Sequence, residues 1–444
     1  MSPLSRLSSR VSAVAEQLVD PRVGIVRAVE VLKLEAGSPR FFHCSARACN
    51  LAACGLQASH AALDGASPDR ESAAVKAIVE ALRFYCAAFY DPEDLALTSS
   101  DDASFECAAP STFALYAPEQ HQDPDFPYEP FTGASQVRWA PAIDLGSGTS
   151  CHVPAAMVMA PYAPRPGSGE ASIAPHTSTG LACACSAAEA AISAICSAVQ
   201  DDAMALVWQA RIAPPQIRVE TLSDPGYELV ARIEDTVGAV TLFDLSMVSG
   251  VPVVLAALRC KEPGSPALVC AGGAAPDPES AVRSALEDLA LALHHSSRIK
   301  AHAPPLEPTG DHRGVVDQAG HLRFWCDHTH APLADHLFGS KERVDFDALP
   351  DLSSADPREC QRALVDTIRA AGHQALFVDL TTRDLRDLGL VVARVVVPGL
   401  QPLFMGHRLR ALGGSRVREA SRRLGRPSAA GADAPHPYLM KGSV

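Results

Sequence analysis

A turn of small residues followed by one long predicted helix contains groups that could hold a phosphate. Ser178, Thr179 and Gly180 form the turn, and backbone N–H groups near the start of a helix bind anions. The same residues could instead form only the tight turn that delivers the chain to the helix. Ser186 followed three residues later by Glu189 forms a capping box, so we expect the helix to begin there.

Three predicted helices carry the polar residues that a metal–nucleotide site would require. Such a site needs carboxylates from several elements, together with basic groups for the phosphates. On a period of about 3.6 residues, the long helix places Glu189, Ser197 and Gln200 on one face. Helices beginning near positions 71 and 278 carry Glu80 and Asp288. The three helices could therefore converge on one site.

Each of these acidic residues also has a purely structural explanation. The capping box accounts completely for Glu189. Glu80 and Arg83 are three residues apart and could form a plain surface ion pair. Asp288 follows Glu287, so both could belong to the polar face of a helix.

Composition and charge exclude several classes of protein. The net charge of −13 disfavours nucleic acid or an anionic membrane as the main partner. No apolar run approaches the roughly 20 residues that a membrane span requires, and the N-terminus lacks the apolar region of a secretory signal. The sequence therefore predicts a cytoplasmic protein.

The cysteines and histidines do not form a recognisable metal or disulfide framework. An odd number of cysteines, 13, without a secretory signal argues against a disulfide scaffold, and no CxxC pair occurs. The histidines between positions 294 and 330 do not complete a set of ligands at metal-binding spacing. We expect buried thiols in an alanine-rich core and no zinc site.

The order of predicted elements indicates an α+β fold, with mainly antiparallel sheets packed against long helices. Most connections between the predicted strands are too short for a crossover helix, so antiparallel pairing should dominate. After a helix over 357–371, two strands separated by a short helix resemble a βαβ unit. The other predicted strands span residues 136–145, 152–162, 216–222, 227–235, 239–247, 251–260 and 267–275.

We expect a single composite domain with peripheral ends. Residues 1–22 form an N-terminal extension, and the domain covers 23–438 with loop-rich insertions at about 91–133 and 303–357. A basic, proline-containing C-terminal tail covers 404–444. This tail could be solvated and partly mobile, or it could dock an acidic partner or phosphates.

Five motifs, in order along roughly residues 23–438, resemble those of the YcaO-domain family. The last two resemble the family's azoline-forming members in particular. The motifs are "AVKAIVEALRFY" (74–85), "TSTGLACACSAAEA" (177–190), "CAGGAAPDPESAVRSALEDL" (270–289), "LFVDLTTRDLRDLGLVVARVVVPGLQPL" (376–403) and "PHPYL" (435–439).

The resemblance implies an ATP- and magnesium-dependent chemistry on a ribosomally made precursor peptide. Such enzymes phosphorylate a backbone amide oxygen after Cys, Ser or Thr attacks it, forming thiazoline or oxazoline rings. A separate partner would grip the peptide's leader. The residues that would bind ATP and magnesium are Glu80, Ser178, Thr179, Gly180, Glu189, Ser197, Gln200 and Asp288, with Glu80 and Glu189 as metal ligands.

The family's proline-rich tail implies a role for Pro435, His436 and Pro437 in the active site. His436 could then be a proton shuttle or a bystander, and the tail could equally lie free.

The site departs from the family pattern where charge matters most. Ser197 and Gln200 stand where glutamates are expected, and Asp201 stands in place of an arginine. Fewer carboxylates bind magnesium more weakly, and a lost arginine removes a bidentate phosphate clamp. Further departures are Cys185 for Asn, Arg83 for Glu, Phe84 for Arg and Leu291 for Gln, while Asp288 shortens a Glu.

The sequence therefore predicts a divergent, catalytically weakened component of an azoline-forming peptide-modification system. Its partners would be a precursor peptide and a leader-binding protein, an active YcaO protein, or both, in a homodimer or a heterodimer. One alternative is an active ATP-dependent cyclodehydratase. Another is an accessory factor for the modification of a ribosomal protein.

Overall fold

Three β-sheets and the helices between them make up the protein. The computed structural model describes residues 3–35, 37–51, 63–306, 310–403, 405–429 and 433–438. The sheets have the strand orders β1-β2-β3, β11-β10-β9-β8-β12 and β4-β5-β13-β14-β7, with β6 paired to β5. Among the described strands only β8 and β12 pair in parallel, so the predicted α+β class with mainly antiparallel sheets is confirmed.

The strands in chain order are β1 Val26–Val31, β2 Phe42–Ala48, β3 Leu63–Ser67, β4 Ala96–Thr98, β5 Val137–Asp144, β6 Ser150–Pro154, β7 Leu181–Ala184, β8 Gln216–Ile217, β9 Val240–Asp244, β10 Val253–Arg259, β11 Leu268–Ala274, β12 Arg343–Val344, β13 Leu376–Asp379 and β14 Val391–Val396. The helices are α1 Pro3–Ala13, α2 Ala15–Leu18, α3 Arg70–Ala88, α4 Ala187–Gln209, α5 Asp224–Glu234, α6 Pro278–His302, α7 Gln318–Phe324, α8 Pro357–Ala370, α9 Arg383–Asp387 and α10 Arg416–Arg423.

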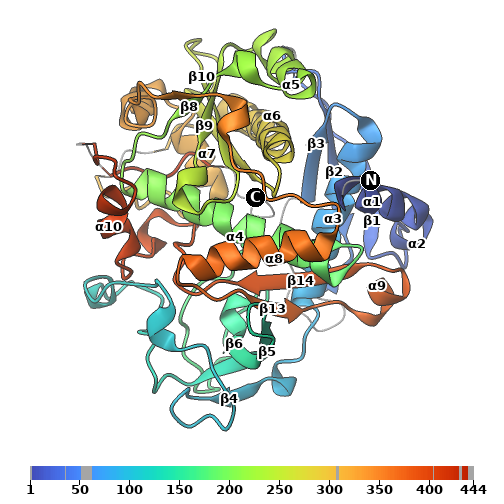
Figure 1. Ribbon diagram of the computed structural model, residues 1–444, viewed down its shortest axis with the longest axis vertical. Helices are drawn as coiled ribbons and strands as arrows, with labels where there is room; N and C mark the ends of the chain where they lie inside the picture. Colours follow the sequence, from blue (N-terminus) through green and yellow to red (C-terminus); the bar gives the residue numbers. More distant parts are fainter. Residues whose placement is uncertain are drawn as a thin grey trace.

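Helix α4 lies in the middle of the molecule, between two sheets. It packs on β7 and β14 on one side and on β11 and β10 on the other, and α8 runs beside it (Figure 1). Strand β10 is buried on both faces, which explains its unbroken apolar sequence. Its alternate residues Val253, Leu255 and Ala257 join the core around α4, and Val254, Ala256 and Leu258 join the core around α6.

Local capping starts the long helices where the sequence indicates. Ser186 caps α4, and its side chain accepts a hydrogen bond from the Glu189 backbone N–H. Asp277 caps α6 in the same way through Ser280, with Pro278 in the first turn. Each such cap stabilises its helix by about 1 kcal/mol.

One predicted strand is a helix. Of the predicted strand 227–235, residues 227–234 belong to α5, whose N-cap is Ser223 and whose first turn contains Pro225. Leu229, Val230 and Ile233 are its buried residues, at the spacing of one helical face. The strand prediction was wrong because the β-branched residues favoured a strand while the helical start signal just before them decided the structure.

The predicted βαβ-like unit is also wrong in its pairing. Strands β13 and β14 are antiparallel neighbours, with Leu376 opposite Val396. The connecting helix α9 has 5 residues, whereas a parallel crossover needs about a dozen or more. A short helix therefore allows a hairpin-like return and not a crossover.

The described part of the C-terminal region packs into the fold and is not a solvated tail. In α10, Ala420 is buried in a small cluster with Leu206, Ala210 and Ile212 from the end of α4 and the turn after it. Residues 433–438 run through the interior, where Tyr438 is fully buried. The closing Leu439 and the residues after it lie outside the described part.

Helix α4 is long and apolar enough to span a membrane, alone among the helices of the described ranges. However, 83% of its most apolar window is buried inside the protein. Because it is buried, α4 is a core helix of the protein.

Candidate functional site

A stripe of charged residues runs along α3 toward the core. Lys76, Glu80 and Arg83 follow one another at helical spacing, so they share a face. Glu80 is buried, and its Oε1 lies 2.5 Å from the Arg83 guanidinium. Its Oε2 is buried without a hydrogen-bond partner among the described residues. This oxygen is the one carboxylate atom of the stripe that could accept a ligand.

Helix α6 approaches α3 through Glu287, a residue that sequence reasoning did not select. Its carboxylate forms an ion pair with Lys76 and lies 3.1 Å from the Ser67 hydroxyl, which donates to it. Asp288, which the sequence did select, is also buried beside it. Helices α3 and α6 therefore meet through Lys76 and Glu287, and an ion pair within the chain occupies this contact.

The small-residue turn before α4 is held by residues of α4 itself. Gly180 has a φ of 72°, and a Cβ there would collide with the Val395 carbonyl. Its N–H donates to the Ser197 hydroxyl at 3.2 Å. The Thr179 hydroxyl donates to Asp201 at 2.5 Å. These contacts favour the structural explanation of the turn, because the Gly180 N–H is already engaged.

Asp201 connects this turn to α3. Burial raises its pKa to about 6, while the Thr179 hydrogen bond and the nearby Arg83 guanidinium lower it. Sequence reasoning treated Asp201 only as a residue that stands in place of an arginine. Its place four residues after Ser197, on the same face of α4, was the available signal that both residues serve the turn.

Glu189 is closed off by the N-terminal helix. Arg6 in α1 donates to its Oε1, with Nη2 at 2.5 Å and Nε at 2.7 Å. The Ser186 hydroxyl donates to its Oε2 at 3.1 Å. Only 4% of Glu189 is exposed. Arg6 comes from the segment that the sequence assigned to a peripheral extension, and nothing in the sequence pattern pointed to this contact.

Gln200 packs against a strand and does not face the other site residues. A Cβ on Gly272 in β11 would lie 3.2 Å from the Gln200 Cγ, so the glycine is what allows the approach. From Glu189 to Asp201 the axis of α4 covers roughly 18 Å, at about 1.5 Å per residue. The selected residues of α4 therefore have different neighbours.

Side-chain donors hold the backbone of the C-terminal segment in the interior. Pro435, His436 and Pro437 lie within it, and the His436 ring stacks on His321 with centroids 3.8 Å apart. The carbonyls of Ala434, Pro435, His436 and Tyr438 are bound by Trp208, Trp325, His321 and Gln318, respectively.

This segment lies at the far end of α4 from Glu189. His436 lines a small cavity together with Ala205 and Gln209. Ala205 is roughly 24 Å from Glu189 along the helix axis, since each residue rises by about 1.5 Å. His436 and Glu189 therefore have separate surroundings.

A second buried charge pair joins α4 to α10. Asp202 has no exposed surface, and the Arg416 Nε donates to its Oδ1 at 3.1 Å. The Gln401 backbone N–H also donates to Oδ1, at 2.7 Å. This network fixes the basic C-terminal region onto the core.

The residues present do not fit magnesium–ATP in this arrangement. Magnesium requires several hard oxygen ligands, yet Glu189 and Glu287 are already bound by Arg6 and Lys76. Among Glu80, Glu189 and Glu287, only the Oε2 of Glu80 has no hydrogen-bond partner among the described residues. Within the described ranges, no group of three or more His, Cys, Asp or Glu residues is placed to hold a metal ion.

Two solved structures share the fold. A structure described as a heterocyclase in complex with substrate and cofactor matches with a TM-score of 0.78 and 17% identity, covering 97% of this chain. This chain spans 57% of that protein's length. YcaO from Methanopyrus kandleri, bound with AMPPCP and Mg2+, matches with a TM-score of 0.63 and 21% identity, covering 97% of this chain and 95% of that one.

The sequence comparisons agree with this fold. An uncharacterized protein of Methanothermobacter thermautotrophicus is 30% identical over an alignment of 288 residues that covers 62% of this chain and 70% of that protein. The profile of the family described as YcaO cyclodehydratase, ATP- and Mg2+-binding, matches residues 64–401. Family profile, fold and motifs agree, and the chain belongs to the YcaO family.

Proposed function

We propose that this protein is a divergent YcaO component of an azoline-forming peptide-modification system, and that it does not itself transfer phosphate. One observation carries the proposal: the buried glutamates at or next to the residues assigned to ATP and magnesium have basic partners from the same chain. Glu80 pairs with Arg83, Glu189 with Arg6, and Glu287 with Lys76.

The energetics of burial explain why these pairs oppose nucleotide binding. A buried carboxylate is stable only when paired or protonated, and these pairs provide the compensation without any ligand. Magnesium would have to displace the basic partners, and a triphosphate would then meet Asp201 on α4. Each displacement costs hydrogen bonds that a metal must replace.

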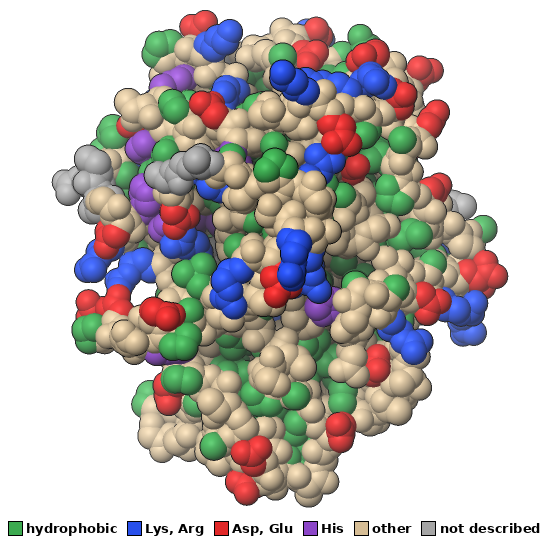
Figure 2. Space-filling view, turned by 60° about the vertical axis from the view of Figure 1, so that its left-hand side comes forward, with side chains coloured by type: hydrophobic (Ala, Val, Ile, Leu, Met, Phe, Trp, Pro, Cys, Tyr) green, Lys and Arg blue, Asp and Glu red, His purple; other side chains and the backbone are tan. Residues whose placement is uncertain are grey.

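The fold supports a role with a peptide and a partner protein. The similar heterocyclase is described in complex with substrate and cofactor, so the fold itself is compatible with binding a substrate. We infer a precursor peptide as substrate, a leader-binding protein or an active YcaO protein as partner, and a cytoplasmic site of action. Figure 2 shows acidic and basic side chains interspersed over one face, with no continuous basic surface there for nucleic acid.

A second candidate is an active ATP-dependent cyclodehydratase. It is favoured by the unpartnered Oε2 of Glu80, which is buried and could accept a metal ion. The similar YcaO from Methanopyrus kandleri is bound with AMPPCP and Mg2+, and this chain covers 95% of its length.

Isothermal titration with AMPPCP and Mg2+ distinguishes the two candidates. We expect no binding heat for this protein under conditions in which a YcaO protein with a full set of carboxylates binds. Glu80→Gln is the matched variant, because it keeps the shape of the side chain and removes its charge. Micromolar binding that this variant abolishes would establish a working nucleotide site and overturn the proposal.

A further inference from the structure

Beside α4, on the side that faces α8, there is a cavity of about 600 Å³. This volume lies in the range of about 300–1,000 Å³ that ligand pockets occupy. Leu145, Ala187, Ala188 and Val365 supply apolar parts of its lining. Arg358 and Arg362 supply its two positive charges, both from α8. We name this cavity the α8 pocket.

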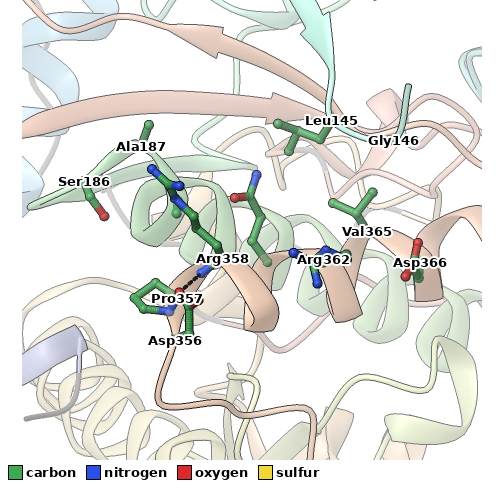
Figure 3. A pocket seen from close by; sticks show the side chains of 12 residues that line it. Leu145, Gly146, Ser186, Ala187, Asp356, Pro357, Arg358, Arg362, Val365 and Asp366 are labelled. Atoms are coloured by element: carbon green, nitrogen blue, oxygen red, sulfur yellow. Dashed lines mark hydrogen bonds between the residues drawn. The ribbon is translucent and has the colours of Figure 1, made fainter. Parts of the chain in front are cut away.

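The two arginines are unpaired. Across the ranges that the structure describes, neither guanidinium has an ion pair or a hydrogen bond, and both side chains are exposed to solvent. In Figure 3, Arg358 extends across the pocket toward Ser186 and Ala187. The pocket therefore presents two guanidinium groups without ion-pair partners next to an apolar wall, together with the carboxylates of Asp356 and Asp366.

Asp356 and Asp366 also line the pocket and keep their negative charge, but neither forms an ion pair with Arg358 or Arg362 among the described residues. Asp356 accepts a hydrogen bond from the Arg358 backbone N–H at 2.9 Å, as the helix cap. Glu359 accepts from the Ser354 hydroxyl at 2.9 Å. Asp366 lies 4.0 Å from Arg369, one turn further along the helix.

The position of the arginines is unfavourable for α8 itself. They are four residues apart, so their charges repel across one helical turn. Arg358 also stands in the first turn, where the helix dipole disfavours a cation. Neither effect helps the fold, whereas both are relieved when an anionic group binds between the side chains.

We propose that the α8 pocket binds an acidic peptide segment, with Arg358 and Arg362 holding its carboxylates and the apolar wall contacting its neighbouring side chains. Guanidinium groups bind carboxylates with directed, charge-assisted hydrogen bonds. A mixed charged and apolar lining suits a peptide with alternating acidic and apolar residues. That the ligand is a peptide rests on the proposed function; that the ligand is anionic rests on the pocket alone.

Fluorescence anisotropy tests this proposal with a labelled hexapeptide of alternating Leu and Glu, and with the same peptide carrying Gln in place of Glu. We expect the Glu peptide to bind at least ten-fold more tightly than the Gln peptide, and its affinity to fall as salt is raised. Equal affinities for the two peptides would overturn the proposal.

Variants locate the binding. Arg358→Gln combined with Arg362→Gln should weaken binding of the Glu peptide at least ten-fold. The thermal midpoint of this double variant should stay at or above that of the wild-type protein. Arg422→Gln with Arg423→Gln, an equal change of charge on the exposed face of α10, is the control and should change the affinity less than two-fold. If the two double variants weaken binding equally, the α8 pocket is not the site.

A second variant tests the pocket through its volume and leaves its charge alone. Ala188→Leu fills the cavity with a good helix former and should weaken peptide binding, whereas unchanged binding would contradict the assignment. Tripolyphosphate is the competing probe. If it binds at the arginines and the Glu peptide does not, the pocket is a phosphate site and the peptide assignment is wrong.

This experiment is independent of the nucleotide titration. Peptide binding lost in the Arg358 and Arg362 variant, together with measured AMPPCP binding, would overturn the proposed function and leave the pocket intact. Peptide binding that is unchanged in this variant, together with no AMPPCP binding, would leave the proposed function standing and exclude the α8 pocket as the peptide site.

Discussion

Two charged regions of the protein differ in how their charges are stabilised. The buried glutamates Glu80, Glu189 and Glu287, here called the carboxylate cluster, have basic partners within the chain. The arginines of the α8 pocket are exposed and have no such partner among the described residues. Burial explains the difference, because a buried charge without a partner is costly and an exposed one is solvated. The glutamates of the region that resembles a catalytic site are therefore paired within the chain, and the proposed ligand pocket lies beside it.

The largest effect should come from breaking a buried pair. Arg416→Met leaves Asp202 without its guanidinium in a fully buried position. We expect the free energy of unfolding to fall by about 3–5 kcal/mol. Urea denaturation measures this, and adding Asp202→Asn should recover part of the loss. A loss below 1 kcal/mol would show that buried charges here do not depend on their partners.

The partly buried Asp201 extends the comparison through the pH dependence of stability. Its pKa in the folded state is raised from 3.8 to about 6, so its contribution to stability is present below pH 4 and is lost as the pH rises through 6. At pH 8 the ionised, partly buried side chain should cost up to about 3 kcal/mol, at 1.36 kcal/mol per pKa unit.

Asp201→Asn removes this titration and can still accept the Thr179 hydrogen bond. Its stability relative to the wild type should rise between pH 4 and pH 8, as measured by urea denaturation at both values. A difference that does not change with pH would contradict the raised pKa.

Removing the basic partner of Glu189 tests whether the ion pairs of the carboxylate cluster prevent a metal ion from binding. Arg6→Gln leaves a carboxylate that is 4% exposed with the Ser186 hydrogen bond alone. We expect a loss of about 1–2 kcal/mol in unfolding free energy, because a buried charge loses a strong hydrogen bond. The lost stability should return when millimolar Mg2+ is added, as seen in the thermal midpoint, since a divalent cation can take the place of the guanidinium.

Arg22→Gln, an exposed arginine elsewhere in the N-terminal segment, is the control and should show neither change. If Mg2+ does not stabilise the Arg6→Gln variant, a metal ion does not take the place of the Arg6 guanidinium beside Glu189.

The smallest effect should come from the α8 pocket, and with the opposite sign. Arg358→Gln relieves repulsion across one helical turn and an unfavourable helix dipole. We expect the protein to become more stable by about 0.5 kcal/mol. Thermal unfolding at low and high salt measures this, and the gain should shrink in high salt because salt screens exposed charges. A loss of stability would show that Arg358 has a structural partner in solution.

Sequence patterns predicted what depends on neighbours along the chain. The starts of α4 and α6 follow from Ser186 and Asp277, whose side chains bind N–H groups three residues ahead. Antiparallel pairing followed from short connections, and the YcaO motifs led to the right family. The same local reasoning failed at α5, where β-branched residues follow a helix cap and two local signals disagree.

Only the tertiary structure decided which charges meet. Arg6 and Glu189 are 183 residues apart, and Lys76 and Glu287 are 211 apart, so no spacing rule could relate them. The sequence by itself determined the elements and the family, because caps, turns and apolar periodicity are local. The folded chain determined that the three glutamates of the carboxylate cluster have basic partners and that two arginines of α8 have none among the described residues, because burial and charge pairing depend on segments that meet only after folding.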